Sequence, residues 1–101
     1  MADAELTEFE ADVLDTIGSL QPGEIVTYGE IAAEVGKPGA ARAVGSALRR
    51  HGNDVPWWRV VAANGRLVPG GEGRQTKKLK AEGVPVRNGR VVMSQRADEQ
   101  G

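Results

Sequence analysis

Two tryptophans, Trp57 and Trp58, stand side by side after a proline and before an arginine, and the chain contains no third tryptophan. An indole ring offers a flat apolar face and one N–H donor, so it can fill a core or hold a flat ligand against a surface. A nucleic-acid base that stacks on such a ring gains about 1–3 kcal/mol of binding free energy. From the residues taken alone, core packing and base stacking are both open for this pair.

The groups that usually carry enzyme chemistry are scarce in this sequence. The chain has no cysteine and one histidine, His51, which excludes a disulfide framework, a thiolate metal site, a cysteine nucleophile and the usual zinc-site spacings. We therefore expect neither a metal nor a cofactor. A new enzyme chemistry would need an acid–base pair, and His51, in the expected loop after the third helix, has no evident partner.

Charged residues are separated along the chain. Residues 1–34 contain nine acidic residues and no lysine or arginine, whereas residues 35–96 contain thirteen basic residues and three acidic ones. Such a separation predicts two faces of opposite sign, of which the basic one could meet a polyanion. The alternative is a solvated surface on which like charges happen to gather.

Length and composition fit a single small domain. With 101 residues, of which 40% are hydrophobic, the chain can bury a modest core. We expect one domain over residues 1–101 with its core at about residues 6–93. No apolar run approaches the roughly 20 residues of a membrane span, and the acidic start differs from a signal peptide. These features predict a soluble, cytoplasmic protein without a membrane partner.

Hydrophobic periodicity and turn signals predict four helices, over residues 6–20, 28–35, 40–50 and 73–83. Capping boxes begin the first two helices, with Thr7 and Glu10 in one and Thr27 and Glu30 in the other. A tight glycine-containing turn joins the second and third helices, which is typical of a helix-turn-helix but also of ordinary helical hairpins. Gly83 is the expected C-terminal cap of the fourth helix.

Two β-hairpins are predicted in the second half of the chain. Residues 58–68 form one hairpin about Asn64-Gly65, and residues 84–93 form another about Asn88-Gly89. Residues 94–101 are expected to fray. The predicted fold class is therefore α+β, mostly α: a single winged helix-turn-helix domain with short β-hairpins.

Small residues occupy most positions of the third helix, beside Arg42, Arg49 and Arg50. A helix without bulky side chains can bring its backbone close to another surface, whereas a helix that reads the major groove carries long polar side chains. The composition therefore favours contact with the minor groove and with phosphates, with one protruding arginine. Tight packing of this helix inside the core explains the same composition equally well.

Three segments resemble one known family. Residues 27–50, residues 55–61 and the later loop at residues 69–71 are similar, in this order and spacing, to the DNA-binding domain of the O6-alkylguanine-DNA alkyltransferases. In that family a Pro-Cys-His-Arg-Val motif holds the cysteine that accepts the alkyl group, and here residues 56–60 are Pro-Trp-Trp-Arg-Val. Tryptophan in place of the cysteine is the pattern of the alkyltransferase-like proteins. The resemblance covers about residues 8–93.

The resemblance implies a DNA-binding surface and a lesion pocket. Tyr28 would help to rotate the 3′ phosphate of the target nucleotide, Arg42 would enter the base stack from the minor groove, and Trp57 would cover the flipped alkylated guanine. Trp58, as the next residue along a strand, would point to the opposite side and pack in the core. The implied DNA-contact residues are Thr27, Tyr28, Ala41, Arg42, Gly45, Ser46 and Arg49. The implied pocket residues are Tyr28, Val55, Pro56, Trp57, Arg59, Pro69, Gly70 and Gly71.

The sequence also departs from the family's pattern. Trp57 and Trp58 replace the nucleophile and the histidine that activates it, and the sequence shows no clear counterpart of the carboxylate that orients this histidine. Alkyl transfer is therefore excluded. The pocket loop also lacks the basic residue that contacts the lesion in some relatives, since Arg66 and Arg74 lie outside it.

These features imply a monomeric, non-enzymatic protein that binds O6-alkylguanine in double-stranded DNA and flips the base. It would flag the lesion for nucleotide excision repair proteins, for which the acidic first helix is a candidate surface. The alternative is a winged-helix transcription regulator without lesion specificity. Such a regulator needs long polar residues on its recognition helix and usually a dimer interface, and neither is evident.

Overall fold

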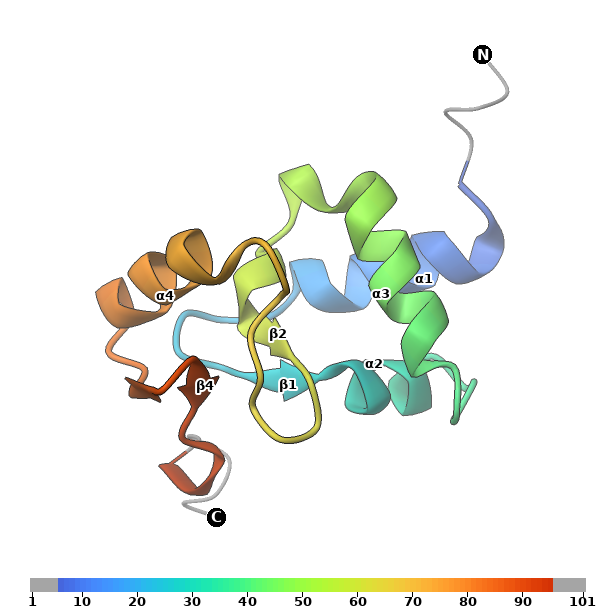
Figure 1. Ribbon diagram of the computed structural model, residues 1–101. Coiled ribbons are helices and arrows are strands. Elements are labelled where there is room, and N and C mark those ends of the chain that lie inside the picture. Colours follow the sequence, from blue (N-terminus) through green and yellow to red (C-terminus); the bar gives the residue numbers. More distant parts are fainter. Residues whose placement is uncertain (1–5, 96–101) are drawn as a thin grey trace.

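Four helices and two short strand pairs make up residues 6–95, the part of the chain that the computed structural model describes (Figure 1). The helices are α1 (Glu8–Gly18), α2 (Tyr28–Glu34), α3 (Ala41–His51) and α4 (Glu72–Ala81). The strands are β1 (Val26–Thr27), β2 (Val60–Val61), β3 (Val86–Arg87) and β4 (Arg90–Val91). Three 3-10 turns are η2 (Gly52–Asp54), η3 (Trp57–Arg59) and η4 (Met93–Gln95). No helix in this range is long and apolar enough to cross a membrane. The expected fraying of residues 94–101 falls mostly outside the range, although the first two of these residues belong to η4.

The first two helices begin at capping boxes, as predicted. The Thr7 hydroxyl accepts a hydrogen bond from the Glu10 N–H, and the Glu10 carboxylate accepts one from the Thr7 N–H, both at 3.0 Å. Thr27 and Glu30 repeat this arrangement before α2. Each box satisfies two backbone donors that a helix start would leave open. The second box thereby fixes Tyr28 at the first position of α2.

Glycine ends α4, which confirms the predicted cap. Gly83 has a φ of 79°, its N–H donates to the Lys80 carbonyl, and the Val84 N–H donates to the Leu79 carbonyl, both at 3.0 Å. This left-handed conformation favours glycine, because a Cβ would be strained there. Gly36, with a φ of 80°, ends α2 in the same way.

Apolar residues form two clusters that meet at β2. The larger cluster joins α1, α2 and α3 and contains Val13, Ile17, Leu20, Ile31, Ala32, Val44, Ala47 and Val60. The smaller cluster lies under α4 and the β3–β4 hairpin and contains Ile25, Val61, Leu67, Leu79, Val84 and Val91. Successive strand residues point to opposite faces, so Val60 enters one cluster and Val61 the other. Strand β2 therefore joins the two halves of the fold.

Strand β2 pairs with β1 in parallel, which corrects the hairpin predicted over residues 58–68. Val60 lies opposite Val26, and Val61 lies opposite Thr27. Parallel strands cannot be joined by a tight turn and need a longer crossover, which α2 and α3 supply here. The hairpin prediction was wrong because the true partner of β2 lies far earlier in the chain.

The turn at Asn64-Gly65 is present, but its second arm pairs with β4. The Gly65 N–H donates to the Ala62 carbonyl at 2.8 Å and closes the turn. Arg66 then forms an isolated antiparallel bridge with Arg90. Strand β4 approaches so closely that a Cβ on Gly65, whose φ is 85°, would stand 2.4 Å from the Val91 carbonyl oxygen. This position therefore requires glycine.

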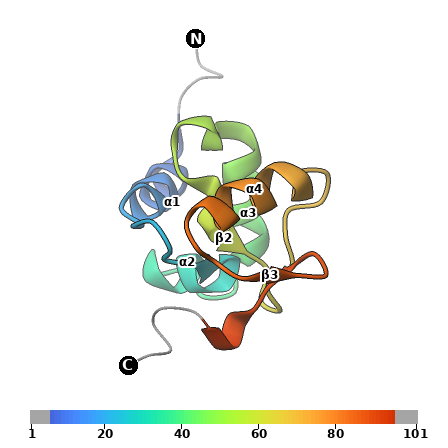
Figure 2. The same ribbon diagram turned by 90° about the vertical axis from the view of Figure 1, so that its left-hand side faces the viewer.

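Strands β3 and β4 form the second predicted hairpin, which we call the wing. Arg87 lies opposite Arg90, and the turn residues Asn88 and Gly89 both have positive φ, at 54° and 74°, as a type I′ turn requires. The wing lies on the far side of the molecule from α1 (Figure 2). Together with the α2–α3 pair it confirms the predicted class, a mostly helical winged helix-turn-helix domain.

Candidate nucleic-acid interface

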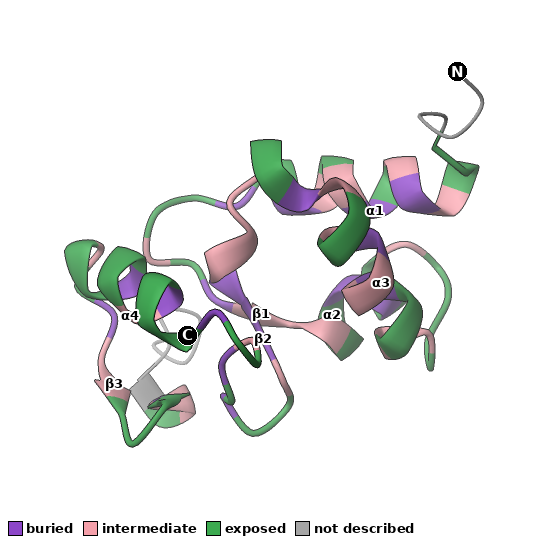
Figure 3. Cartoon of the chain, turned by 45° about the horizontal axis from the view of Figure 1, so that its top comes forward, coloured by how far each residue is buried: buried purple, intermediate pink, exposed green. Residues whose placement is uncertain are grey.

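One side of α3 is turned to solvent (Figure 3). Arg42, Gly45, Ser46 and Arg49 follow the spacing i, i+3, i+4 and i+7, so they share one helix face. The two arginines are exposed, and the two small residues between them are partly exposed. Among the small residues of α3, Ala47 packs in the larger cluster. Core packing therefore explains the small residue on one side of the helix, and the other side is open to another surface.

Tyr28 lies against this open face. A Cβ on Gly45 would meet the Tyr28 ring at 3.9 Å, an ordinary van der Waals contact. Burial raises the pKa of Tyr28 above its ordinary value of 10.0, and the charge of Arg49 acts in the opposite direction. The hydroxyl therefore keeps its proton at neutral pH and can donate a hydrogen bond to a phosphate oxygen.

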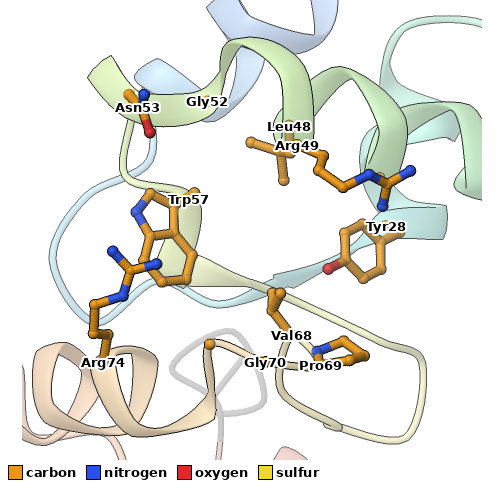
Figure 4. Close-up of a pocket in the computed structure, with 12 residues that line it drawn as sticks. Tyr28, Leu48, Arg49, Gly52, Asn53, Trp57, Val68, Pro69, Gly70 and Arg74 are labelled. Carbon is orange, nitrogen blue, oxygen red and sulfur yellow. The ribbon is translucent and has the colours of Figure 1, made fainter.

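A cavity of about 420 Å³ opens beside the same face, between α3, η3 and the loop before α4 (Figure 4). It is lined by Tyr28, Gly45, Leu48, Arg49, Gly52, Asn53, Trp57, Val68, Pro69, Gly70, Gly71 and Arg74. Trp57 and Arg74 lie together at one end, and Tyr28 and Arg49 lie at the other (Figure 4). The volume is typical of a small-molecule site, so the cavity can admit a flat ring system.

The cavity brings together part of the predicted set. The pocket residues that line it are Tyr28, Trp57, Pro69, Gly70 and Gly71, and the predicted DNA-contact residues Gly45 and Arg49 join them. Three predicted pocket residues, Val55, Pro56 and Arg59, are not among its lining residues. The remaining predicted DNA-contact residues, Thr27, Ala41, Arg42 and Ser46, also lie outside it.

Sequence reasoning missed five lining residues, Leu48, Gly52, Asn53, Val68 and Arg74. Arg74 matters most, because its guanidinium carbon lies 5.6 Å from the centroid of the Trp57 ring, within cation–π distance. Although it is outside the pocket loop in sequence, the first turn of α4 carries it to the cavity wall. For Val68 the available signal was its place directly before the predicted loop.

Trp57 and Trp58 occupy different environments, but strand alternation is not the cause. Both stand in the 3-10 turn η3, where their rings are perpendicular, at 87°, with centroids 6.1 Å apart. Trp57 lines the cavity, while Trp58 packs against the smaller cluster. The expectation that Trp58 would face the core is confirmed, and the strand expected at these two residues is wrong.

The sequence shows no clear counterpart of the carboxylate that orients the histidine in the alkyltransferases, but the structure places one, Glu82, beside Trp58. The indole Nε1 of Trp58 donates to Glu82 Oε2 at 2.8 Å. Trp58 stands where the alkyltransferase motif has its histidine, so Glu82 lies against the residue that replaces this histidine. The two residues are distant in sequence, and no local pattern marks the pair.

Arg59 forms an ion pair with the Glu82 carboxylate and does not line the cavity. Its Nη2 is 2.7 Å from Glu82 Oε2, and its Nη1 donates to the Leu20 carbonyl at 2.8 Å. Burial alone would raise the pKa of Glu82, but hydrogen bonds from Arg59, Trp58 and the Gly23 N–H outweigh it and hold this pKa at about 2. The ionised carboxylate therefore ties the end of α4 to the tryptophan segment.

Gln75 holds the cavity wall from the opposite side. It is fully buried, its Oε1 accepts from the Val68 N–H at 2.7 Å, and its Nε2 donates to the carbonyls of Trp58 and Val60, both at 3.1 Å. One side chain thus fixes α4, the loop wall and the start of β2 relative to one another.

His51 is the last residue of α3, which corrects its expected place in a loop. Its Nε2 lies 3.6 Å from Glu10 Oε1, and Arg50 pairs with the same carboxylate. These contacts join α3 to α1, and His51 does not line the cavity. Within residues 6–95 no group of three or more histidine, aspartate or glutamate side chains is placed to hold a metal ion.

Comparison with known proteins identifies the family. The family model for the DNA-binding domain of 6-O-methylguanine DNA methyltransferase matches residues 8–84. The chain is 39% identical over 85 residues to a DNA base-flipping protein of Vibrio parahaemolyticus, covering 80% of this chain and 85% of that protein. It is 38% identical over 87 residues to Alkyltransferase-like protein 1 of Schizosaccharomyces pombe, covering 80% of this chain and 81% of that protein.

Solved structures show the same fold. The S. pombe Atl1 protein in complex with damaged DNA containing O6-carboxymethylguanine matches with a TM-score of 0.74 and 37% identity, covering 82% of each chain.

A methylated-DNA–protein-cysteine methyltransferase of Methanosarcina acetivorans is 43% identical over 83 residues, and the chain spans 53% of its length. Since this chain contains no cysteine, transfer of a methyl group to cysteine is not open to it. The chain belongs to the family that shares the DNA-binding domain of 6-O-methylguanine DNA methyltransferase, and within it to the alkyltransferase-like proteins.

Proposed function

We propose that this protein binds O6-alkylguanine in double-stranded DNA without repairing it, with α3 in the minor groove and the flipped base in the cavity. The observation that carries the proposal is that the cavity opens onto the exposed side of α3, because Gly45 and Arg49 belong to both. A duplex along α3 would have one nucleotide within reach of Trp57. The base-flipping relative and the damaged-DNA complex of the S. pombe protein support the same ligand.

Arg42 is the proposed replacement for the flipped base. It is exposed on the open face, and within residues 6–95 its guanidinium has no hydrogen bond or ion pair. Flipping costs a few kcal/mol of unstacking and unpairing, and less at a damaged pair. A planar guanidinium in the vacated space offsets part of this cost by stacking on the neighbouring bases.

Trp57 and Arg74 would hold the flipped base together. The indole covers the base or its alkyl group, and the guanidinium beside it presents N–H donors to the acceptors O6 and N7 of guanine. Arg74 would therefore supply the cation that the pocket loop lacks.

The proposed consequence of binding is a signal. Because no cysteine removes the alkyl group, the lesion stays in the complex, where nucleotide excision repair proteins can find it. The exposed residues Glu8, Asp12 and Asp15 of α1 form a candidate surface for such a partner. The protein would act as a monomer in the cytoplasm, on chromosomal DNA.

Titration with two duplexes tests this function. We expect a duplex with O6-methylguanine to bind more tightly than its guanine counterpart and to change the fluorescence of Trp57, because only the damaged base is easily flipped. Added salt should weaken binding to both duplexes steeply while leaving their affinity ratio nearly unchanged, since counterion release acts on both. A Trp57→Phe variant assigns the fluorescence change. Equal affinity for the two duplexes would indicate an operator-binding regulator, and a ratio that vanishes with salt would indicate surface electrostatics.

Arg42→Ala should weaken binding to the lesion duplex by at least about 1–3 kcal/mol, because the vacated space in the base stack is then unfilled. The melting temperature should stay close to that of the parent, since Arg42 is exposed. Arg42→Lys is the matched control, because it keeps the charge and loses the planar group. A lysine variant that binds like the parent, or an alanine variant that unfolds, would refute the intercalating role.

A further inference from the structure

Three arginines stand side by side across the wing. Arg90 of β4 lies opposite Arg87 of β3 and also bridges to Arg66 on its other side. Side chains of directly opposed residues in antiparallel strands point to the same face, with Cβ atoms about 4.5–5.5 Å apart. Arg66, Arg90 and Arg87 therefore form one row of like charge, which we call the arginine row.

This row costs the fold stability. Like charges directly opposite one another destabilise a sheet. On one side of the bridge between Arg66 and Arg90 the Leu67 N–H donates to the Gly89 carbonyl at 3.3 Å, and on the other the Val91 N–H donates to the Gly65 carbonyl at 2.8 Å. Arg66 and Arg90 are therefore a pair without hydrogen bonds of its own, the arrangement in which opposed side chains come closest. All three arginines are exposed, and within residues 6–95 none of them has an ion-pair partner. An anion from outside the chain would relieve the repulsion.

A cleft of about 560 Å³ lies between the row and the cavity. One wall of the cleft is formed by Arg66, Arg90 and the Asn88-Gly89 turn. The cleft shares two lining residues with the cavity, Tyr28 and Pro69. Glu72 is the acidic residue among those that line the cleft, and its carboxylate accepts the Gly70 N–H at 2.9 Å. A strand that delivers a nucleotide to the cavity past Tyr28 therefore has its next phosphates near the row.

We propose that the arginine row binds phosphate groups of the same duplex, beside the nucleotide that enters the cavity. This inference rests on the proposed function, because it takes the same DNA as the ligand. Guanidinium groups suit phosphate oxygens, since their paired N–H donors match the oxygen spacing. Arg87 and Arg90 follow residues 8–84, the range that the family model matches, whereas Arg66 lies within it. The two wing arginines would therefore extend the DNA surface beyond the shared domain.

The test compares Arg66→Gln/Arg90→Gln with the parent on the O6-methylguanine duplex over a range of NaCl concentrations. Each arginine that contacts a phosphate contributes about 0.9 to the slope of log affinity against log salt. The double variant should therefore lower the magnitude of this slope by about 2 and bind several-fold more weakly at low salt. The affinity ratio between damaged and undamaged duplex should not change. An unchanged slope would overturn the proposal, and it is the result expected if the row serves a protein or a small anion instead.

A charge-matched control is Lys77→Gln/Lys80→Gln on α4, since neither lysine lines the cavity or the cleft. Its salt slope should stay near that of the parent, and an equal loss in this control would overturn the proposal as a general effect of net charge. The arginine double variant should also melt at the same temperature as the parent or higher, because a repulsive pair is gone. A lower melting temperature would show a structural role and overturn the proposal.

Failure of the proposed function gives a different result. If the parent protein showed no preference for the O6-methylguanine duplex, the proposal that it recognises O6-alkylguanine would be refuted. The salt slope on undamaged duplex, compared between parent and double variant, would still decide whether the row contacts phosphates.

Discussion

Glu82→Ala is expected to destabilise the protein by about 3–5 kcal/mol, because it leaves the charge of Arg59 buried without a partner. Arg59 is 8% exposed, and Glu82 is its ion-pair partner, at 2.7 Å. The indole N–H of Trp58 and the N–H of Gly23 lose their acceptor at the same time. Urea unfolding at neutral pH measures the loss.

Two further variants separate the buried pair from a general effect of charge. Glu34→Ala removes an exposed carboxylate from α2 and should change the free energy of unfolding by no more than about 0.5 kcal/mol. Glu82→Ala combined with Arg59→Met should recover part of the loss, because no unpaired charge is then buried. A Glu82→Ala variant as stable as the Glu34→Ala control would show that the pair does not hold the fold.

The same carboxylate gives the stability a pH signature. Hydrogen bonds, which outweigh the effect of burial, hold the pKa of Glu82 at about 2 in the folded protein, below its ordinary value of 4.5. The folded state therefore binds this proton less readily than the unfolded chain, and the contribution is fully present above about pH 4.5 and is lost as the pH falls towards 2. In Glu82→Gln this part of the acid-induced fall in melting temperature should be missing.

Trp57→Cys combined with Trp58→His should gain the ability to accept a methyl group, whereas Trp57→Cys alone should not. A lone thiol with a pKa near 8.5 is only a few per cent thiolate at neutral pH. In the double variant the imidazole would take the thiol proton, and the sulfur would attack the methyl carbon as the bond to O6 breaks. The guanine anion that forms would stay in the duplex and take up a proton from water.

The structure supports this gain because Glu82 is already in place. Indole Nε1 and imidazole Nε2 are both two bonds from Cγ, so a histidine at position 58 can direct an N–H at the carboxylate that now accepts from Trp58 at 2.8 Å. Such a carboxylate orients the ring and stabilises its protonated form. Mass spectrometry after incubation with the O6-methylguanine duplex detects the added methyl group. The triple variant that also carries Glu82→Gln should lose the gain, and transfer by Trp57→Cys alone would reveal another activator.

Local signals made the helices predictable, and distant contacts made the rest unpredictable. The capping boxes at Thr7 and Thr27 depend on residues three positions apart, so the sequence is sufficient to locate the helix starts. The Asn64-Gly65 signal correctly predicts a turn, but it contains no information about which strand lies beside β2. That choice depends on packing between the two clusters, which no short window of sequence describes.

The site divides in the same way. Tyr28, Trp57 and the loop at residues 69–71 could be predicted because the family motifs mark them. Arg74 and Glu82 could not, because the packing of α4 places them against the two tryptophans. Arg74 lies on a basic, mostly exposed helix and Glu82 directly follows its last residue, so sequence alone gives no reason to separate them from their solvated neighbours.

The buried amide of Gln75 fixes the position of the loop that forms one wall of the cavity. Turning this amide by half a rotation would set its NH2 group against the Val68 N–H and its oxygen against two carbonyls, so a single orientation satisfies all three hydrogen bonds. The loop wall is thereby ordered when the chain folds, and little of its conformational entropy is left to be lost when a ligand arrives. In the proposed function, a flipped base would therefore meet a cavity of fixed size, which changes only if the packing of Gln75 beneath the loop wall changes.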